Sequence, residues 1–173
     1  MVHYLNQFFT GVGGEDAAST GPAHADGPVG PGRKLQALLG DDFEIVATVS
    51  CGDDYAAGRD NATAEILALV KQAEPDLVVV GPAFSSGRYG LACGRLAAAA
   101  VGEGMAVVAA MHEDNPGVEE AGAAAVVRSG EAAREMGPSL EVLATAVHKL
   151  MAGEALTGAD GRLGNAPRRN TVA

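Results

Sequence analysis

The feature that most constrains the fold is the alternation of short apolar runs with longer segments of helical periodicity. The run FEIVATVSC (43–51) is rich in β-branched residues, which is typical of parallel strands covered on both faces. The segment NATAEILALVKQAE (61–74) instead repeats apolar residues at helical spacing. This alternation predicts an α/β fold, a flavodoxin-like or Rossmann-like open parallel sheet with helices on both faces. We expect five strands, at residues 3–9, 43–51, 76–84, 105–111 and 123–130.

The chain of 173 residues is long enough for one domain with one sizeable core, and no internal repeat divides it. Residues 10–32 are dense in Gly, Pro and small polar residues, which predicts a long loop. We therefore expect a single α/β domain over residues 1–155, followed by a polar tail over residues 156–173 that can contact a partner. Helices are expected at residues 33–40, 61–74, 89–104 and 139–154.

Charge and cysteine content exclude several classes of protein. The formal net charge of -10 argues against binding to nucleic acid or to an anionic membrane surface. No apolar run reaches the roughly 18 residues that a membrane-spanning helix needs, and the N-terminus lacks the pattern of a signal peptide. Cys51 and Cys93 fit neither a disulfide framework nor a zinc-binding spacing. We therefore expect a cytoplasmic protein with no metal site.

The predicted topology indicates where a ligand would bind. In open parallel sheets, ligands bind beyond the carboxyl ends of the strands, close to the point where the strand order reverses. Four loops follow the first four predicted strands. They are TGVGGED (10–16), CGDDY (51–55), GPAFSSGRYG (81–90) and HEDNPG (112–117).

Small residues in two of these loops make them candidates for substrate binding. Ser85, Ser86 and Gly87 have short side chains, so backbone N–H groups can approach a ligand closely. Gly13 and Gly14 offer the same possibility in the first loop. The first loop matches neither the GxGxxG fingerprint nor the GxxxxGK[ST] loop, so a phosphate-binding role is not favoured there.

Arg88 and Tyr89 are candidates for binding a carboxylate. A guanidinium and a phenol beside exposed backbone N–H groups can hold that group through charge-assisted hydrogen bonds. The alternative is structural: Arg88 can cap a neighbouring loop, or pair with Asp53 or Asp54.

The HEDNPG loop provides the candidate acid–base groups. His112 and Glu113 can act as a general acid or base, and Glu113 can also hold a cationic amine. We expect Arg88 and Glu113 to lie within the length of one small molecule. The alternative is a plain turn, for which Asn115 and Pro116 are typical residues.

The two cysteines admit both a catalytic and a structural interpretation. Cys93 lies close to a predicted helix start, which lowers a thiol pKa, but packing is favoured for a small apolar side chain there. Cys51, at the carboxyl end of a predicted strand, is the better candidate for a catalytic thiol in contact with the cleft.

Four long blocks of the chain resemble one enzyme family. They are HYLNQFFTGVGGED, GPVGPGRKLQALLGDDFEIVATVSCGDDY, PDLVVVGPAFSSGRYGLACG and HEDNPGVE. In this order they are similar to the N-terminal half of the substrate-specific B component of glycine, sarcosine and betaine reductases. The resemblance covers residues 2–120 and continues more weakly to the predicted helix at 139–154. It implies reductive cleavage of a C–N, or related C–X, bond in a small amino-acid-like substrate.

The resemblance also implies partners. Members of this family carry a reactive selenol or thiol in a UxxCxxC-like motif, which is absent from these 173 residues. We therefore expect no cofactor in this chain and a catalytic thiol or selenol from a partner subunit with a CxxC or UxxC motif. A thioredoxin-like reductant would complete the cycle. Such a chain is either a fragment or a naturally split subunit, and is expected to be inactive alone.

A second function from a different class remains open. The chain can be a non-catalytic flavodoxin-like subunit that binds or scaffolds other members of a complex. Flavin binding itself is not favoured, because the first loop is long and the chain contains no Trp to stack on the flavin ring.

Overall fold

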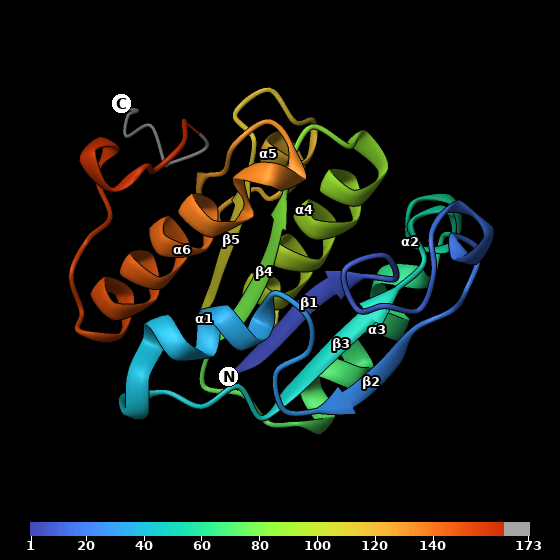
Figure 1. The fold of residues 1–173 in the computed structure, drawn as a ribbon, viewed down its shortest axis with the longest axis horizontal. Helices are drawn as coiled ribbons and strands as arrows, with labels where there is room; N and C mark the ends of the chain where they lie inside the picture. The colour runs from blue at the N-terminus through green and yellow to red at the C-terminus, as the bar shows by residue number, and fades with distance from the viewer. Residues whose placement is uncertain (165–173) are drawn as a thin grey trace.

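The computed structural model describes residues 1–164, which form one six-stranded sheet with helices on both faces (Figure 1). The strand order is β2-β3-β1-β4-β5-β6, and β2 is the antiparallel member. The other five strands are parallel to their neighbours. Their order is the flavodoxin-like one, so the predicted fold class is confirmed. The strands are β1 (Val2–Asn6), β2 (Ala23–Asp26), β3 (Ala47–Cys51), β4 (Val78–Ala83), β5 (Val107–Met111) and β6 (Ala125–Arg128).

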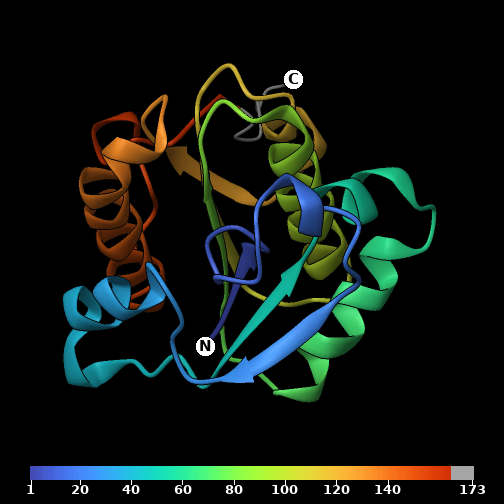
Figure 2. The same cartoon turned by 45° about the vertical axis from the view of Figure 1, so that its right-hand side comes forward.

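Helices cover both faces of the sheet, as Figure 2 shows from the side. On one face, Leu35 of α1 and Leu143 of α6 are buried in a core with Val79. On the other face, Leu96 of α4 is buried in a second core with Val80. Neighbouring residues of β4 thus point to opposite cores, which explains its unbroken apolar sequence. The helices are α1 (Gly32–Leu39), α2 (Asp53–Gly58), α3 (Ala62–Gln72), α4 (Gly87–Gly102), α5 (Gly117–Glu120) and α6 (Met136–Met151).

Two expectations about the first part of the chain are wrong. The predicted loop at 10–32 contains the edge strand β2, whose four residues are all exposed and which is held by antiparallel pairing with β3. The first strand was expected to reach residue 9 but ends at Asn6. There the backbone turns: Thr10 N–H donates to the Asn6 carbonyl over 3.2 Å, and Phe9 N–H donates to Asn6 Oδ1 over 3.0 Å.

The segment expected as a polar tail begins against the domain. Leu156 and Leu163 are buried, and Leu163 N–H donates to the Val126 carbonyl over 2.9 Å. Residues 165–173 of that segment lie outside the described residues. Within residues 1–164, no helix combines the length and apolar character that crossing a bilayer requires.

Candidate functional site

A cavity of about 440 Å³ lies at the carboxyl ends of β1, β3 and β4, on both sides of the first strand. This is where the strand order changes direction, the place at which open α/β sheets bind ligands. Residues of four segments line it: 6–9 with 14–15 at and after the end of β1, Asp53 at the start of α2, 84–86 with 88–89 at the junction of β4 and α4, and 131–133 after β6.

A network of buried polar side chains forms the floor of this cavity. Asn6, Gln7 and Asp53 are each at least nine-tenths buried. Asn6 Nδ2 donates to Asp53 Oδ2 over 3.0 Å, and Asp53 N–H donates to Gln7 Oε1 over 3.0 Å. Gln7 Nε2 donates in turn to the Gly14 carbonyl over 3.3 Å. These bonds fix the position of the Asp53 carboxyl group.

One carboxyl oxygen of Asp53 is an unpaired acceptor. Its Oδ1 atom is buried and has no hydrogen-bond partner in the described part of the chain. Burial raises the pKa of Asp53, and the hydrogen bond from Asn6 and the charge of Arg88 oppose that rise. Leaving a buried acceptor unpaired costs about 1–3 kcal/mol. A ligand that brings a positive charge or an N–H donor to Oδ1 removes this cost.

Arg88 connects three loops at the cavity. Its guanidinium pairs with Glu15 of the first loop over 2.7 Å and with Asp54 of the second loop. The expected alternative, a pair between Arg88 and an aspartate of the CGDDY loop, is therefore confirmed for Asp54. The side chains of all three residues are more than 40% exposed, and exposed ion pairs contribute little to stability. A ligand carboxylate can therefore replace Glu15 or Asp54 as the partner of Arg88 at little cost.

The loop after β4 is held in place by residues of the segments that follow β5 and β6. Asn115 Nδ2 donates to the carbonyls of Phe84 (2.8 Å) and Ser86 (3.0 Å), and Ser85 N–H donates to the Glu131 carbonyl over 3.2 Å. Helix α4 follows, and no side chain caps its N-terminus at Ser86. Its first N–H groups therefore remain available to an anion.

The structure brings most of the predicted substrate-binding residues together. Gly14, Ser85, Ser86, Arg88 and Tyr89 all line this cavity. Tyr89 is only 1% exposed and packs against Phe9 with ring centroids 6.0 Å apart, so it forms part of the wall.

Two of the predicted small residues lie next to the cavity without lining it. Gly87 is the first residue of α4, and Gly13 precedes the lining residue Gly14.

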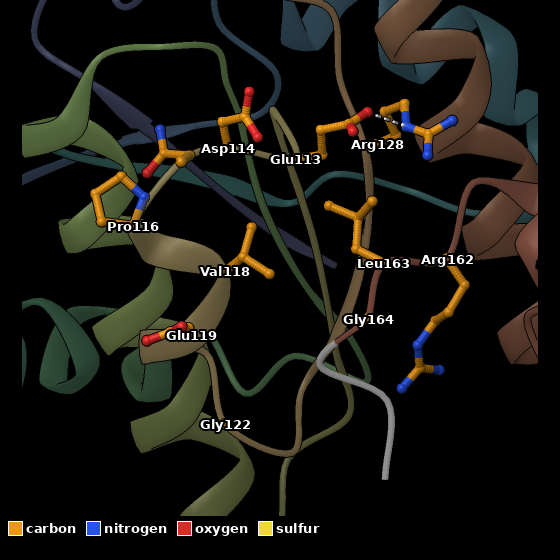
Figure 3. A pocket seen from close by; sticks show the side chains of 11 residues that line it. Glu113, Asp114, Pro116, Val118, Glu119, Gly122, Arg128, Arg162, Leu163 and Gly164 are labelled. Atoms are coloured by element: carbon orange, nitrogen blue, oxygen red, sulfur yellow. Dashed lines mark ion pairs between the residues drawn. The ribbon is translucent and has the colours of Figure 1, made fainter. Parts of the chain in front are cut away.

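Glu113 lies in a different place. It lines a second cavity of about 780 Å³ and pairs there with Arg128, Nε to Oε1 over 3.0 Å (Figure 3). Arg162 lines the same cavity on the side of Arg128, opposite Pro116 and Glu119 (Figure 3). Arg88 and Glu113 thus line separate cavities, and the structure does not bring them to one site.

His112 lines neither of these two cavities, and its Nδ1 accepts a hydrogen bond from Asp114 N–H over 3.2 Å. The Asn115 N–H donates to the His112 carbonyl over 2.9 Å, so HEDNPG forms a turn.

Both cysteines are buried. Cys51 is 2% exposed and Cys93 is fully buried in the core. Burial raises the pKa of Cys51 to about 12 and that of Cys93 well above its usual value. The Cys51 thiol donates to the Thr20 carbonyl at 3.8 Å. Burial therefore favours the neutral thiol of both residues, whereas thiols react as thiolates.

Sequence reasoning missed the polar floor. The sequence pattern indicates Asp53 only as a partner for Arg88, and it predicts strand residues at Asn6 and Gln7. The signal was present, since all three lie at the carboxyl ends of strands in the predicted switch region. Within residues 1–164, no group of three or more His, Cys, Asp or Glu side chains is placed to hold a metal ion.

Comparison with known proteins finds relatives that are all named as subunits of component B of a reductase complex. A "Glycine reductase complex component B subunit gamma" of Symbiobacterium thermophilum is 49% identical over 157 residues, covering 89% of this chain and 37% of that protein. A "Sarcosine reductase complex component B subunit beta" of Peptoclostridium acidaminophilum is 45% identical, over 89% of this chain and 36% of that protein. A "Betaine reductase complex component B subunit beta" of the same organism is 36% identical, over 91% of this chain and 36% of that protein.

The chain spans little more than a third of the length of these relatives. No solved structure matches it significantly. Over residues 1–172 it matches the family described as "Glycine/sarcosine/betaine reductase selenoprotein B (GRDB)". This match covers almost the whole chain, and the expected resemblance is confirmed. The chain belongs to the glycine/sarcosine/betaine reductase selenoprotein B family.

Proposed function

We propose that this chain provides the substrate-binding cavity of a reductase component B, which acts on a small amino-acid-like zwitterion in a reductive C–N cleavage. The observation that carries the proposal is the buried Asp53 carboxyl group, with an unpartnered oxygen at the strand switch point. Relatives of the chain are named as components of glycine, sarcosine and betaine reductase complexes, which supports a role in such a complex.

The cavity offers complementary groups to the two ends of a zwitterion. Asp53 Oδ1 receives the cationic nitrogen, a role that we had expected for Glu113. Arg88 and the uncapped N–H groups at the start of α4 receive the carboxylate. Fixing both ends holds the α-carbon in one position, which reduces the entropic cost of the reaction.

The nucleophile comes from another polypeptide in this proposal. Cys51 and Cys93 are the only cysteines in the sequence, and both are buried with raised pKa values. A thiolate or selenolate from a subunit with a CxxC or UxxC motif attacks the α-carbon and forms an S–C or Se–C bond. The C–N bond breaks, and its electron pair leaves with the nitrogen as the free amine. A thioredoxin-like dithiol then supplies the two electrons that cleave this S–C or Se–C bond. The dithiol becomes a disulfide, the thiol or selenol is regenerated, and the carbon fragment leaves in reduced form.

The test is calorimetric titration of the 173-residue chain with glycine, sarcosine and betaine. We expect Asp53→Asn to weaken binding of glycine and sarcosine by about 10-fold or more, because a hydrogen bond to a charged group contributes about 1.5–3 kcal/mol. Betaine has no N–H to donate, so the same variant should weaken its binding through loss of the charge attraction alone. Arg88→Gln should weaken binding of the same ligands through loss of the carboxylate contact.

Glu113→Gln is the matched control, because Glu113 is an acidic residue of the neighbouring cavity. It should leave all affinities unchanged. A chain that binds none of the three zwitterions, or a Glu113→Gln effect as large as that of Asp53→Asn, contradicts the proposal. The first result would leave the non-catalytic scaffolding role in its place.

A further inference from the structure

The cavity next to Asp53 has an unusually aromatic wall. The sequence contains four Phe, three Tyr and no Trp. More than half of these aromatic residues line this one cavity, namely Phe8, Phe9, Phe84 and Tyr89. They come from two parts of the sequence that are far apart: Phe8 and Phe9 lie in the loop after β1, Phe84 follows β4, and Tyr89 lies in the first turn of α4.

The rings surround Phe9 at different tilts. Its ring centroid lies 5.3 Å from that of Phe8, 6.1 Å from Phe84 and 6.0 Å from Tyr89. The interplanar angles are 75°, 66° and 45°, so the rings do not form a flat stack. Phe84 and Tyr89 are buried, whereas Phe8 is 59% exposed at the cavity. Two rings are therefore fixed by packing, and one large apolar side chain remains open to a ligand.

The charges around these rings favour a cation. Asp53, Glu15 and Glu131 line the cavity together with one cationic residue, Arg88. Of these acids, Asp53 is the buried one, and its Oδ1 has no partner among the described residues. Aromatic faces attract cations through the ring quadrupole, most effectively where water is excluded.

We infer that this cavity recognises the substrate nitrogen through aromatic rings and one carboxylate, so that affinity rises with N-methylation from glycine to sarcosine to betaine. A primary ammonium has three N–H donors that lose water on binding. The wall offers it one unpartnered buried oxygen, and unpaired donors are costly. A trimethylammonium group has no N–H to satisfy, and its methyl groups pack against rings. The inference rests on the proposed function, since it assigns the substrate class of the same site.

The experiment compares four ligands on the 173-residue chain by calorimetry: glycine, sarcosine, betaine and 3,3-dimethylbutanoate. The last has the shape and carboxylate of betaine but carries carbon in place of the cationic nitrogen. We expect betaine to bind at least about 5-fold more tightly than glycine, and at least about 5-fold more tightly than 3,3-dimethylbutanoate.

Variants identify the rings responsible. Phe84→Leu and Phe9→Leu should each weaken the binding of betaine more than the binding of glycine, because a leucine fills space without a ring quadrupole. Phe43→Leu is the control, since Phe43 packs against His148 outside the cavity. Thermal unfolding of each variant shows whether it is folded. If Phe84→Leu does not fold, Phe9→Leu alone provides the comparison of betaine with glycine.

The outcomes separate this inference from the proposed function. The inference is overturned if glycine binds as tightly as betaine, or if 3,3-dimethylbutanoate binds as tightly as betaine. Either result leaves the assignment of the site intact. The inference is also overturned if Phe84→Leu and Phe9→Leu each lower the affinity for betaine and for glycine by the same factor. If none of the zwitterions binds, both the inference and the proposed function are wrong.

Discussion

Acidification should destabilise the chain through His3, a fully buried residue of β1. His3 Nε2 lies 2.6 Å from the Gly81 carbonyl oxygen, and Nδ1 has no partner among the described residues. Burial lowers the pKa of His3 from 6.5 to about 4. Between pH 6.5 and pH 4, His3 is therefore protonated in the unfolded chain but largely neutral in the folded chain. The stabilisation from neutral His3 is complete above pH 6.5 and is lost as the pH falls towards 4.

The size of this effect follows from the pKa shift. Each unit corresponds to about 1.4 kcal/mol, so the loss between pH 7 and pH 4 is about 3 kcal/mol. Urea unfolding at several pH values measures it, with His3→Gln as the test and His24→Gln on the exposed strand β2 as the control. We expect wild type and His24→Gln to lose about 3 kcal/mol more than His3→Gln over this range. Equal losses in all three proteins, or an NMR titration midpoint for His3 near 6.5, would refute the reasoning.

Two further predictions concern packing. Neither Cys51 nor Cys93 should react with a thiol reagent at pH 7.5 until urea unfolds the chain, and Cys93→Ala should cost about 1–2 kcal/mol without changing ligand affinity. Rapid labelling of the native chain contradicts this. Gly90→Ala should destabilise the chain by more than about 2 kcal/mol and weaken ligand binding, because its Cβ would overlap Asn115, which holds the loop after β4. Gly102→Ala, with open space around it, should be neutral or slightly stabilising, and equal melting temperatures for both variants exclude the steric argument.

Much of the fold was predictable because buried positions show as a pattern of apolar residues in the sequence. Strands β4 and β5 are buried on both faces, so their sequences are continuous apolar runs. Strand β3 is buried as well, and its β-branched residues indicated a strand although Thr48 and Ser50 are polar. Strand β2 shows no such pattern, because Ala23–Asp26 are all exposed and become a strand only by pairing with β3. The end of β1 was missed for a related reason. Phe8 and Phe9 look like strand residues, but they line a cavity beyond the turn at Asn6.

The candidate site was predictable at the level of loops and less so at the level of side chains. The rule for carboxyl ends of strands correctly indicated the loops that contain Asp53 and Arg88. It does not distinguish Asp53, which is buried towards the cavity, from its neighbour Asp54, which is exposed and paired with Arg88. It also placed Glu113 with Arg88, whereas Glu113 lines the next cavity and pairs with Arg128. Such choices depend on contacts between distant segments, which local sequence does not encode.

The assignment of the substrate to the cavity at Asp53 is tested most directly by an NMR titration of the ¹⁵N-labelled chain with sarcosine. The account predicts saturable shifts of the backbone amides of residues 6–9, 53–54 and 84–89, all of which line or adjoin the cavity. These shifts should disappear in Asp53→Asn. Shifts centred instead on residues 113–119 and Arg128 of the second cavity, or no shifts at all, would contradict the assignment.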